Sequence, residues 1–211
     1  MAAWAALDLT RRISPIVSYN AAIIRCNQGG KWQMALWLFA SLPERAMSPN
    51  ETSFNLAIHA SATSGKWELA VAFLDSMQSH GIERSPVSVA SVMSACGRAF
   101  RWQAALCIFG QMGAWSMEAD LVTFATAIAA VEKCSRWQAA LDLVEEAIKV
   151  KLKPDAVCFN AAISACGKSG EWQAALAQLA RMECPDQISY NAAIAAVSKG
   201  GLWLQALQAP I

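Results

Sequence analysis

The pentapeptide WQAAL stands at residues 137–141, and the same five letters recur at residues 102–106 and 172–176. The tryptophans that open these copies belong to a longer series, at Trp32, Trp67, Trp102, Trp137, Trp172 and Trp203. The spacings in this series are 35, 35, 35, 35 and 31 residues. A fixed period of this length is typical of units that bury their apolar faces only against copies of themselves. The chain is therefore predicted to be a tandem array whose function is spread along a surface.

Composition is that of a folded chain. Of its 211 residues 55% are apolar, which is enough to bury a large core. No stretch reaches the roughly 18 to 20 apolar residues that a membrane-spanning helix needs, so we expect no membrane association. The net charge of +1 supplies no general basic field, and a case for nucleic acid must rest on where the charges lie.

Catalytic and metal-binding motifs are missing from the sequence. Neither His59 nor His80 stands in a catalytic motif, and both are expected at the surface or at helix ends. The 7 cysteines form no metal-ligand spacing, and no glycine-rich phosphate loop is found. Cys26, Cys96 and Cys166 share one place in the repeat and are expected to be buried, reduced thiols in a non-secretory compartment. The sequence thus predicts no enzyme, no cofactor and no metal.

The period divides the chain into successive units. Their bounds are 16–50, 51–85, 86–120, 121–155, 156–186 and a partial unit at 187–211. Residues 1–15 are interpreted as a degenerate preceding repeat or an amino-terminal remnant, because WAALDL there echoes the WQAALDL at residues 137–143. Without polar capping helices, the array is expected to be part of a longer one or to self-associate through its ends.

Each unit reads as two helices. In the first, small residues alternate with a spaced apolar face, as at Tyr190, Ile194 and Val197. A serine or threonine is expected to be its N-cap, at Ser18, Ser53, Ser88, Thr123 and Ser189. The turn that follows carries glycines able to adopt left-handed geometry, at Gly29, Gly30, Gly65, Gly170, Gly200 and Gly201.

The second helix is expected to open at the tryptophan. An alanine follows three residues later in every unit, and a leucine or valine comes directly after it, as in Ala140 and Leu141. Such a small residue allows close helix packing. The tryptophans are accordingly interpreted as packing residues in preference to ligand-stacking ones.

These in-phase motifs carry a family resemblance over residues 16–211. A unit that reads V-S-Y-N-x-x-I, then Lys-x-Gly, an Ala-Leu seam, Met and Pro-Asp resembles the pentatricopeptide repeat family. The tetratricopeptide repeat has a period of 34 and its own tryptophan pattern, which is absent. The resemblance implies an all-α, right-handed α–α superhelix that binds single-stranded RNA, one base per unit, in a chloroplast or mitochondrion. No clear transit peptide accompanies it.

The resemblance assigns base reading to an asparagine near the start of helix one and to the last residue of the unit. An amide can present both a donor and an acceptor to a base edge. The implied residues are Asn20 with Asn50, Asn55 with Ser85, Asn160 with Asp186, Asn191 alone, and the carboxylates Asp120 and Asp155 in the units where Ala90 and Ala125 replace the asparagine. The family pairing implies a preference for cytosine in the first two units and for uracil in the fifth. The amino end is expected to face the RNA 5′ end.

Two further groups follow from the same resemblance. Branched residues three positions before the asparagine are implied to pack on the base plane, at Val17, Val87, Val122, Val157 and Ile188, whereas Thr52 departs from the pattern. Phosphate contacts are implied for Arg98, Lys133, Lys168 and Lys199. These belong to eight basic residues in the turns, together with Lys31, Lys66, Arg101 and Arg136, which stacking would align along one edge.

Alternatives remain both for the roles of single residues and for the function of the whole chain. Each asparagine could instead cap a helix or bond a neighbouring turn, although the recurrence of four in phase favours base reading. The turn cations could serve the helix dipole and solubility. The competing function is a scaffold that binds other proteins or further repeat units on the same helical surface.

Overall fold

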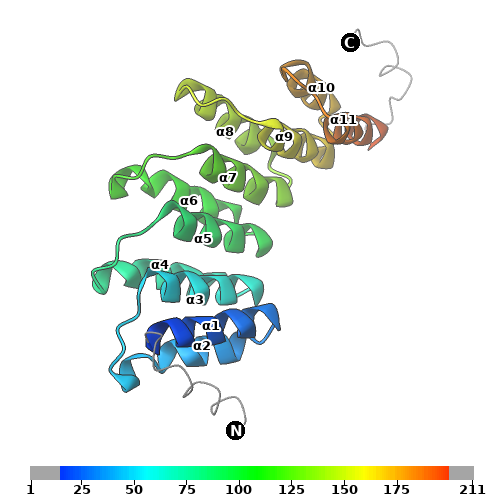
Figure 1. The fold of residues 1–211 in the computed structure, drawn as a ribbon. Helices are drawn as coiled ribbons and strands as arrows, with labels where there is room; N and C mark the ends of the chain where they lie inside the picture. The colour runs from blue at the N-terminus through cyan, green and yellow to red at the C-terminus, as the bar shows by residue number, and fades with distance from the viewer. Residues whose placement is uncertain (1–14, 200–211) are drawn as a thin grey trace. The chain divides into compact units, whose positions relative to one another are not determined.

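The computed structural model describes residues 15–199, which form helices joined by short turns (Figure 1). The α-helices in this range are α1 (Pro15–Gln28), α2 (Trp32–Ala40), α3 (Glu51–Thr63), α4 (Trp67–Ser79), α5 (Pro86–Arg98), α6 (Trp102–Gln111), α7 (Leu121–Lys133), α8 (Trp137–Lys149), α9 (Ala156–Ser169), α10 (Trp172–Ala180) and α11 (Gln187–Lys199). Two 3-10 helices, η1 (Pro43–Arg45) and η2 (Gly113–Trp115), follow α2 and α6. The described range contains no strand, so this part of the chain is all-α, as predicted.

The chain divides into two compact units, residues 1–95 and residues 96–211. The boundary between them falls within α5. In the first unit, α1 packs against α2, α3 packs against α4, and both α1 and α2 contact α3. In the second, α7 packs against α8, and α9 contacts α7, α8, α10 and α11. Neighbouring hairpins therefore stack within each unit. Of the repeat remnant expected at residues 1–15, residues 1–14 lie outside the described residues, as does the segment around Trp203.

Every described second helix opens at its tryptophan, as predicted, at Trp32, Trp67, Trp102, Trp137 and Trp172. The alanine three residues later is fully buried in each, at Ala35, Ala70, Ala105, Ala140 and Ala175. The tryptophan rings themselves are only half-buried. The alanines, and not the tryptophan rings, are therefore the fully buried residues at the start of each second helix.

The expected N-caps were wrong by three residues. The capping residue is the asparagine or aspartate that ends the previous unit, because it holds an extended backbone and aims an oxygen at the helix. Asn50, Asp120 and Asp155 accept from the backbone amides of residues 53, 123 and 158 over 2.9, 2.8 and 3.0 Å. The predicted Ser53, Ser88, Thr123 and Ser189 are instead buried at the third helical position, and Ser18 is the fourth residue of α1.

Three of the glycines expected to be left-handed are so, whereas Gly29 is not, and Gly200 and Gly201 lie outside the described residues. Gly30, Gly65 and Gly170 have φ values of 67°, 73° and 82°. Phe100 and Ser135 occupy the same place in two other turns, with φ values of 57° and 54°. These two turns thus carry a side chain where the backbone favours glycine.

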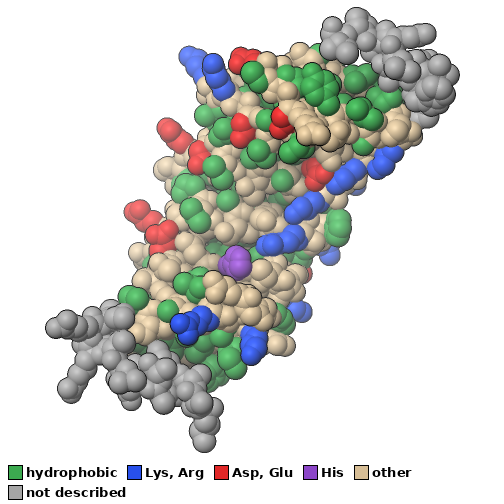
Figure 2. All heavy atoms as spheres, turned by 45° about the vertical axis from the view of Figure 1, so that its right-hand side comes forward, with side chains coloured by type: hydrophobic (Ala, Val, Ile, Leu, Met, Phe, Trp, Pro, Cys, Tyr) green, Lys and Arg blue, Asp and Glu red, His purple; other side chains and the backbone are tan. Residues whose placement is uncertain are grey.

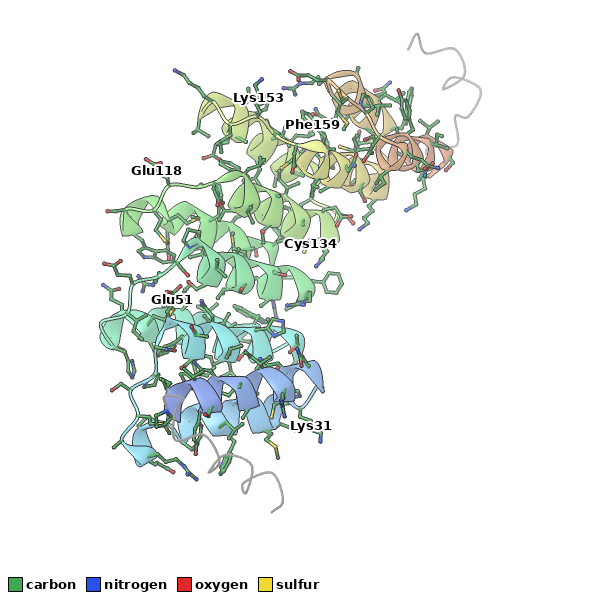
Figure 3. The ribbon with its side chains drawn as sticks, viewed as in Figure 1. Lys31, Glu51, Glu118, Cys134, Lys153 and Phe159 are labelled. Atoms are coloured by element: carbon green, nitrogen blue, oxygen red, sulfur yellow. The ribbon has the colours of Figure 1, made fainter. Side chains whose placement is uncertain are left out.

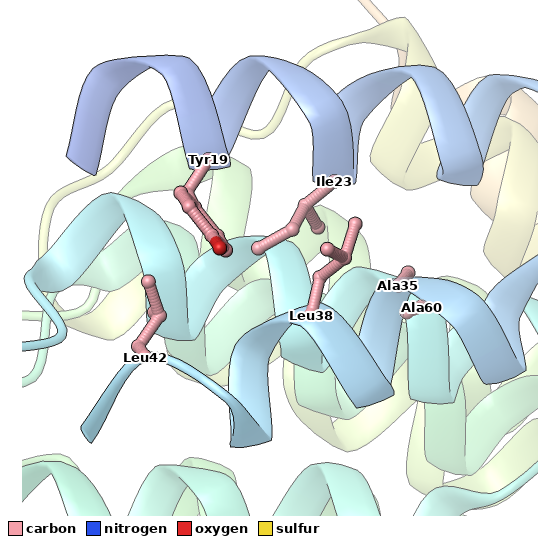
Figure 4. Close-up of a cluster of buried hydrophobic side chains, with 6 residues drawn as sticks. All are labelled: Tyr19, Ile23, Ala35, Leu38, Leu42 and Ala60. Atoms are coloured by element: carbon pink, nitrogen blue, oxygen red, sulfur yellow. The ribbon is translucent and has the colours of Figure 1, made fainter. Parts of the chain in front are cut away.

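The core is a repeated set of aromatic, aliphatic and small residues. In the first unit Tyr19 and Ile23 of α1 meet Leu38 and Leu42, with Ala60 of α3 closing the cluster (Figure 4). The same positions recur as Phe54 with Ile58, Phe124 with Ile128, and Phe159 with Ile163, all buried. One period of sequence thus yields one period of core.

Cys96 and Cys166 are buried, as expected, whereas Cys26 is only half-buried. The correction for Cys26 follows from its place in α1, the first described helix of its unit, with a neighbouring hairpin on one side among the described residues. His59 and His80 are exposed, in agreement with the prediction.

Candidate functional site

The first asparagine pair lies where α1 meets α3. The Asn20 amide nitrogen donates to Asn50 Oδ1 over 3.3 Å, and Ser53 Oγ lies 2.9 Å from Asn20 Oδ1 and 2.8 Å from Asn50 Oδ1. Asn50 Oδ1 also accepts from the Ser53 amide. The predicted partners are therefore together, but Asn20 is only 6% exposed. The exposed amide of this pair is that of Asn50.

An equivalent arrangement joins α9 to α11. The Asn160 amide nitrogen donates to Asp186 Oδ1 over 3.3 Å, and the same oxygen accepts from the Ser189 hydroxyl and amide, each over 2.7 Å. The Ser189 hydroxyl, followed by the Ser189 amide, holds the pKa of Asp186 below its usual value. Asp186 is exposed and thus presents an ionised carboxylate to solvent at neutral pH.

The remaining predicted pairs are not joined in this way. No hydrogen bond links Asn55 to Ser85 in residues 15–95, and Ser85 instead accepts from the Ser88 amide over 3.3 Å. Asn191 is exposed on α11. Asp120 and Asp155 are exposed caps, and the half-buried Ala125 offers no amide to pair with Asp155.

Two amide oxygens at the same place in different hairpins lack a partner. Asn55 Oδ1 and Asn160 Oδ1 are buried and accept no hydrogen bond from any described residue. A buried acceptor without a donor costs free energy, and such groups are few in folded proteins. Both asparagines therefore keep one acceptor that the described residues do not use.

Apolar side chains stand out into solvent at the start of each first helix. The predicted base-packing residues are between 53% and 64% exposed, at Val17, Val87, Val122, Val157 and Ile188. Each lies in the first turn of its helix, or at its third residue in α1, three positions before the place of the asparagine. Thr52 is exposed at the equivalent place in α3. Every described first helix therefore carries an exposed branched side chain in its first turn.

The predicted basic edge exists in residues 96–199. Arg98, Arg101, Lys133, Arg136, Lys168 and Lys199 are all exposed, and blue side chains gather along one edge in the upper part of Figure 2. The Arg136 guanidinium lies 5.2 Å from the centre of the Trp102 ring, which brings two successive turns together. In Figure 3 Cys134 marks this edge, and Glu118 and Lys153 mark the opposite one, formed by the loops between hairpins.

Glu132 lowers the positive charge of the basic edge, and this role was not predicted from the sequence. Its Oε1 accepts from Lys168 Nζ over 2.6 Å and from the Ser164 hydroxyl over 2.7 Å. Lys168 is therefore ion-paired instead of standing free for a phosphate. The adjacent Glu132–Lys133 pair was the available signal, since this acid replaces a glycine or a neutral residue in the other units.

The described residues show no other reactive centre. No group of three or more histidine, cysteine or acidic residues could hold a metal between residues 15 and 199. Burial raises the pKa of Cys158 to about 12 and that of Cys166 to about 11, so both remain thiols. None of the described helices is long and apolar enough to cross a membrane.

A separate hollow of about 840 Å³ opens in the second unit among α6, η2, α7 and α8. Leu106, Phe109 and Phe124 contribute to its apolar lining, and Glu118, Asp142 and Glu146 supply carboxylates. None of the predicted base-reading residues lines it.

Comparison with protein families gives two matches. The model of a family described as pentatricopeptide repeat-containing protein matches residues 51–182. A model of the PPR repeat matches residues 17–46. No curated protein matches the chain.

Solved structures share the fold. The chain is similar to the pentatricopeptide repeat protein PPR10 in complex with an 18-nucleotide psaJ RNA element, with a TM-score of 0.77, 23% identity, and coverage of 94% of this chain and 30% of that one. It is also similar to nuclear proteinaceous RNase P 2 from A. thaliana, with a TM-score of 0.70, 14% identity, and coverage of 89% and 43%. The chain thus spans less than half the length of either neighbour, and the likeness confirms an all-α array of helical hairpins.

Proposed function

Since the chain belongs to the family of pentatricopeptide repeat-containing proteins, we propose that it binds single-stranded RNA along the starts of its first helices. We further propose that binding is selective for sequence. The role that we infer is in RNA processing, stability or translation in an organelle, as the family resemblance implies. The proposal is a binding function without catalysis by this part of the chain.

The exposed branched residues carry the proposal. A valine or isoleucine that is more than half exposed costs free energy in water, and the same cost recurs in hairpin after hairpin at Val17, Val87, Val122, Val157 and Ile188. Val122, Val157 and Ile188 follow the capping residues Asp120, Asp155 and Asp186 by two positions. Flat, apolar base faces would cover them while base edges meet the neighbouring polar groups.

The polar atoms beside these residues fit base edges. One Asp186 oxygen is engaged by Ser189 and Asn160, which leaves Oδ2 to accept from a base. Asn50 similarly uses Oδ1 for its helix and retains a free amide group as a donor. A carboxylate at residue 186 and an amide at residue 50 therefore favour opposite base-edge patterns, which supports uracil in the fifth unit and cytosine in the first.

The basic edge would hold the phosphates of the same strand. Lys133 and Lys199 are exposed at equivalent places two hairpins apart, whereas Lys168, at the equivalent place between them, is ion-paired with Glu132. Phosphate contacts to such cations make binding salt-dependent even though the net charge is only +1.

The test is fluorescence anisotropy of the full chain with a labelled pyrimidine-rich RNA strand and, separately, with its complement, over a series of salt concentrations. We expect tighter binding of the pyrimidine strand. The affinity should fall with salt, with a slope of about 0.7 in log units for each neutralised phosphate. Equal, weak binding of both strands without salt dependence would refute the proposal.

The hollow in the second unit favours a second candidate function. Its apolar lining and carboxylates at Glu118, Asp142 and Glu146 suit a protein segment with basic and apolar side chains. A chain that bound such a segment and showed no strand preference for RNA would be a protein-binding scaffold.

A further inference from the structure

The turn between α5 and α6 holds an aromatic residue in a conformation that favours glycine. Phe100 has a φ of 57°, and its amide donates to the Gly97 carbonyl oxygen over 3.2 Å. The corresponding turns in three other hairpins place Gly30, Gly65 and Gly170 in the same left-handed region. A bulky side chain there strains the backbone, because its Cβ crowds the chain.

Packing gives no compensation for that strain. The Phe100 side chain is 69% exposed, so most of the ring lies in water. The turn therefore bears both a backbone cost and an exposed apolar surface at one residue. Such a combination indicates a contact made with something outside the chain.

The surroundings of the ring specify what it would contact. Arg98 and Arg101 flank Phe100 in the sequence, and both are exposed. Arg136 of the next turn lies over the ring of Trp102, two residues after Phe100, and adds a third cation to these two turns. An exposed ring set among cations is the pattern by which proteins hold single-stranded nucleic acid, with the ring stacking on a base and the cations meeting phosphates.

We infer that Phe100 is a base-stacking site, separate from the row of branched residues at the helix starts. The inference rests on the proposed RNA binding and deepens it. Phe100 lies in the turn that follows α5, whereas the branched residues stand in the first turns of their helices. The ring would therefore stack on a base that the helix starts do not read. Since every base has a π-face, this contact adds affinity without base preference.

The experiment uses three variants of the full chain. Phe100→Gly removes the ring and relieves the strain. Ser135→Gly relieves the same left-handed strain, at φ 54°, without removing a ring, and serves as the matched control. Phe100→Trp keeps an aromatic face.

Affinity for the pyrimidine-rich RNA and melting temperature are measured for each variant. Phe100→Gly is expected to weaken binding by about fivefold or more while melting no lower than the parent chain. Ser135→Gly and Phe100→Trp are expected to keep the parent affinity. In RNAs with one abasic nucleotide, scanned along the strand, one position should weaken binding to the parent chain and cause no further loss in Phe100→Gly.

Three results overturn the inference, and they differ in what they refute. If the parent chain binds RNA with strand preference and salt dependence but Phe100→Gly binds equally well, the stacking site is refuted and the proposed function stands. If the parent chain shows neither property, the proposed function and the stacking site are both refuted. Equal losses of affinity in Phe100→Gly and Ser135→Gly would assign the effect to the backbone of the turns and refute stacking.

Discussion

Asn50, Asp120, Asp155 and Asp186 each hold the next helix with one side-chain oxygen, which leaves the other polar atom directed away from the backbone bond. The two interpretations that compete at the sequence level, helix capping and base reading, thus describe different atoms of the same residue. The resemblance to the repeat family implied these residues, because each one ends a unit. The sequence could not predict the cap, because Ser53 and its equivalents are equally good cap-forming residue types three positions away.

Asp186→Asn tests base reading at a single residue. Asparagine caps as well as aspartate, so the melting temperature should change little. The free atom changes from an acceptor to a donor, and the preference at one RNA position should shift from uracil toward cytosine. Binding is measured with RNAs that vary at each position in turn. Glu183→Gln is the matched control, because it removes one exposed negative charge without changing a residue that closes a unit, and base preference should not move. Identical base preferences in Asp186→Asn and the parent chain would exclude this residue from the code.

The cysteine thiols should differ in their rate of alkylation according to how deeply they are buried. Desolvation raises the pKa of Cys158 to about 12 and that of Cys166 to about 11, so at pH 8 only about one in ten thousand and one in a thousand, respectively, is the reactive thiolate. Brief alkylation of the native protein at pH 8, followed by mass spectrometry, should modify the exposed Cys107 and Cys184 first. Labelling of Cys158 as fast as Cys107 would contradict its burial in α9.

At the scale of the element, each helical hairpin is built from the same pattern of small and large residues. The tryptophan starts the second helix and the alanine three residues later fixes its approach, and both were predictable because they recur at one period. A closer contact was not predictable. A Cβ on Gly97 would lie 2.7 Å from Ala130 Cα, and one on Gly167 would lie 2.9 Å from Ala196 Cβ. Which side of α5 or α9 faces the next helix depends on how the helices stack.

Gly97→Ala tests this approach. Alanine favours a helix over glycine, but here its methyl group collides with the backbone of α7, so the variant should be less stable by about 1 to 3 kcal/mol in urea unfolding. Gly110→Ala in α6 is the control, because a Cβ there meets no atom within 4 Å, and it should gain up to about 1 kcal/mol. A Gly97→Ala variant that matched the control in stability would show that α5 and α7 are not in close contact.

At the scale of the whole molecule, the period of 35 residues predicted the hairpin array and the exposed cations of the turns. It did not predict that Lys168 is neutralised, because the pairing with Glu132 joins residues 36 apart on different helices. Nor did it predict Phe100 as a contact residue. The sequence does show an aromatic residue at the place in the turn where other units have glycine. The exposure of its side chain and its left-handed φ are seen only in the structure.

Glu132→Gln should release Lys168 for phosphate binding. The amide can keep a bond to the Ser164 hydroxyl without holding the ammonium group, so the fold should be retained. RNA affinity at low salt should rise, and the salt slope should steepen by about 0.7 in log units. The exposed Glu183→Gln changes the net charge equally and is the control. Equal gains in both variants would mean that Lys168 has no special part in binding.

The most direct measurement is the affinity of pyrimidine-rich single-stranded RNA for a triple variant, Val122→Ser, Val157→Ser and Ile188→Ser, compared with the parent chain. All three side chains are at least 60% exposed, so the melting temperature should be retained while affinity falls by about tenfold or more. Val150→Ser, an equally apolar change on the exposed end of α8, should leave RNA affinity as it is. Unchanged RNA affinity in the triple variant would contradict the claim that bases lie along the starts of the first helices.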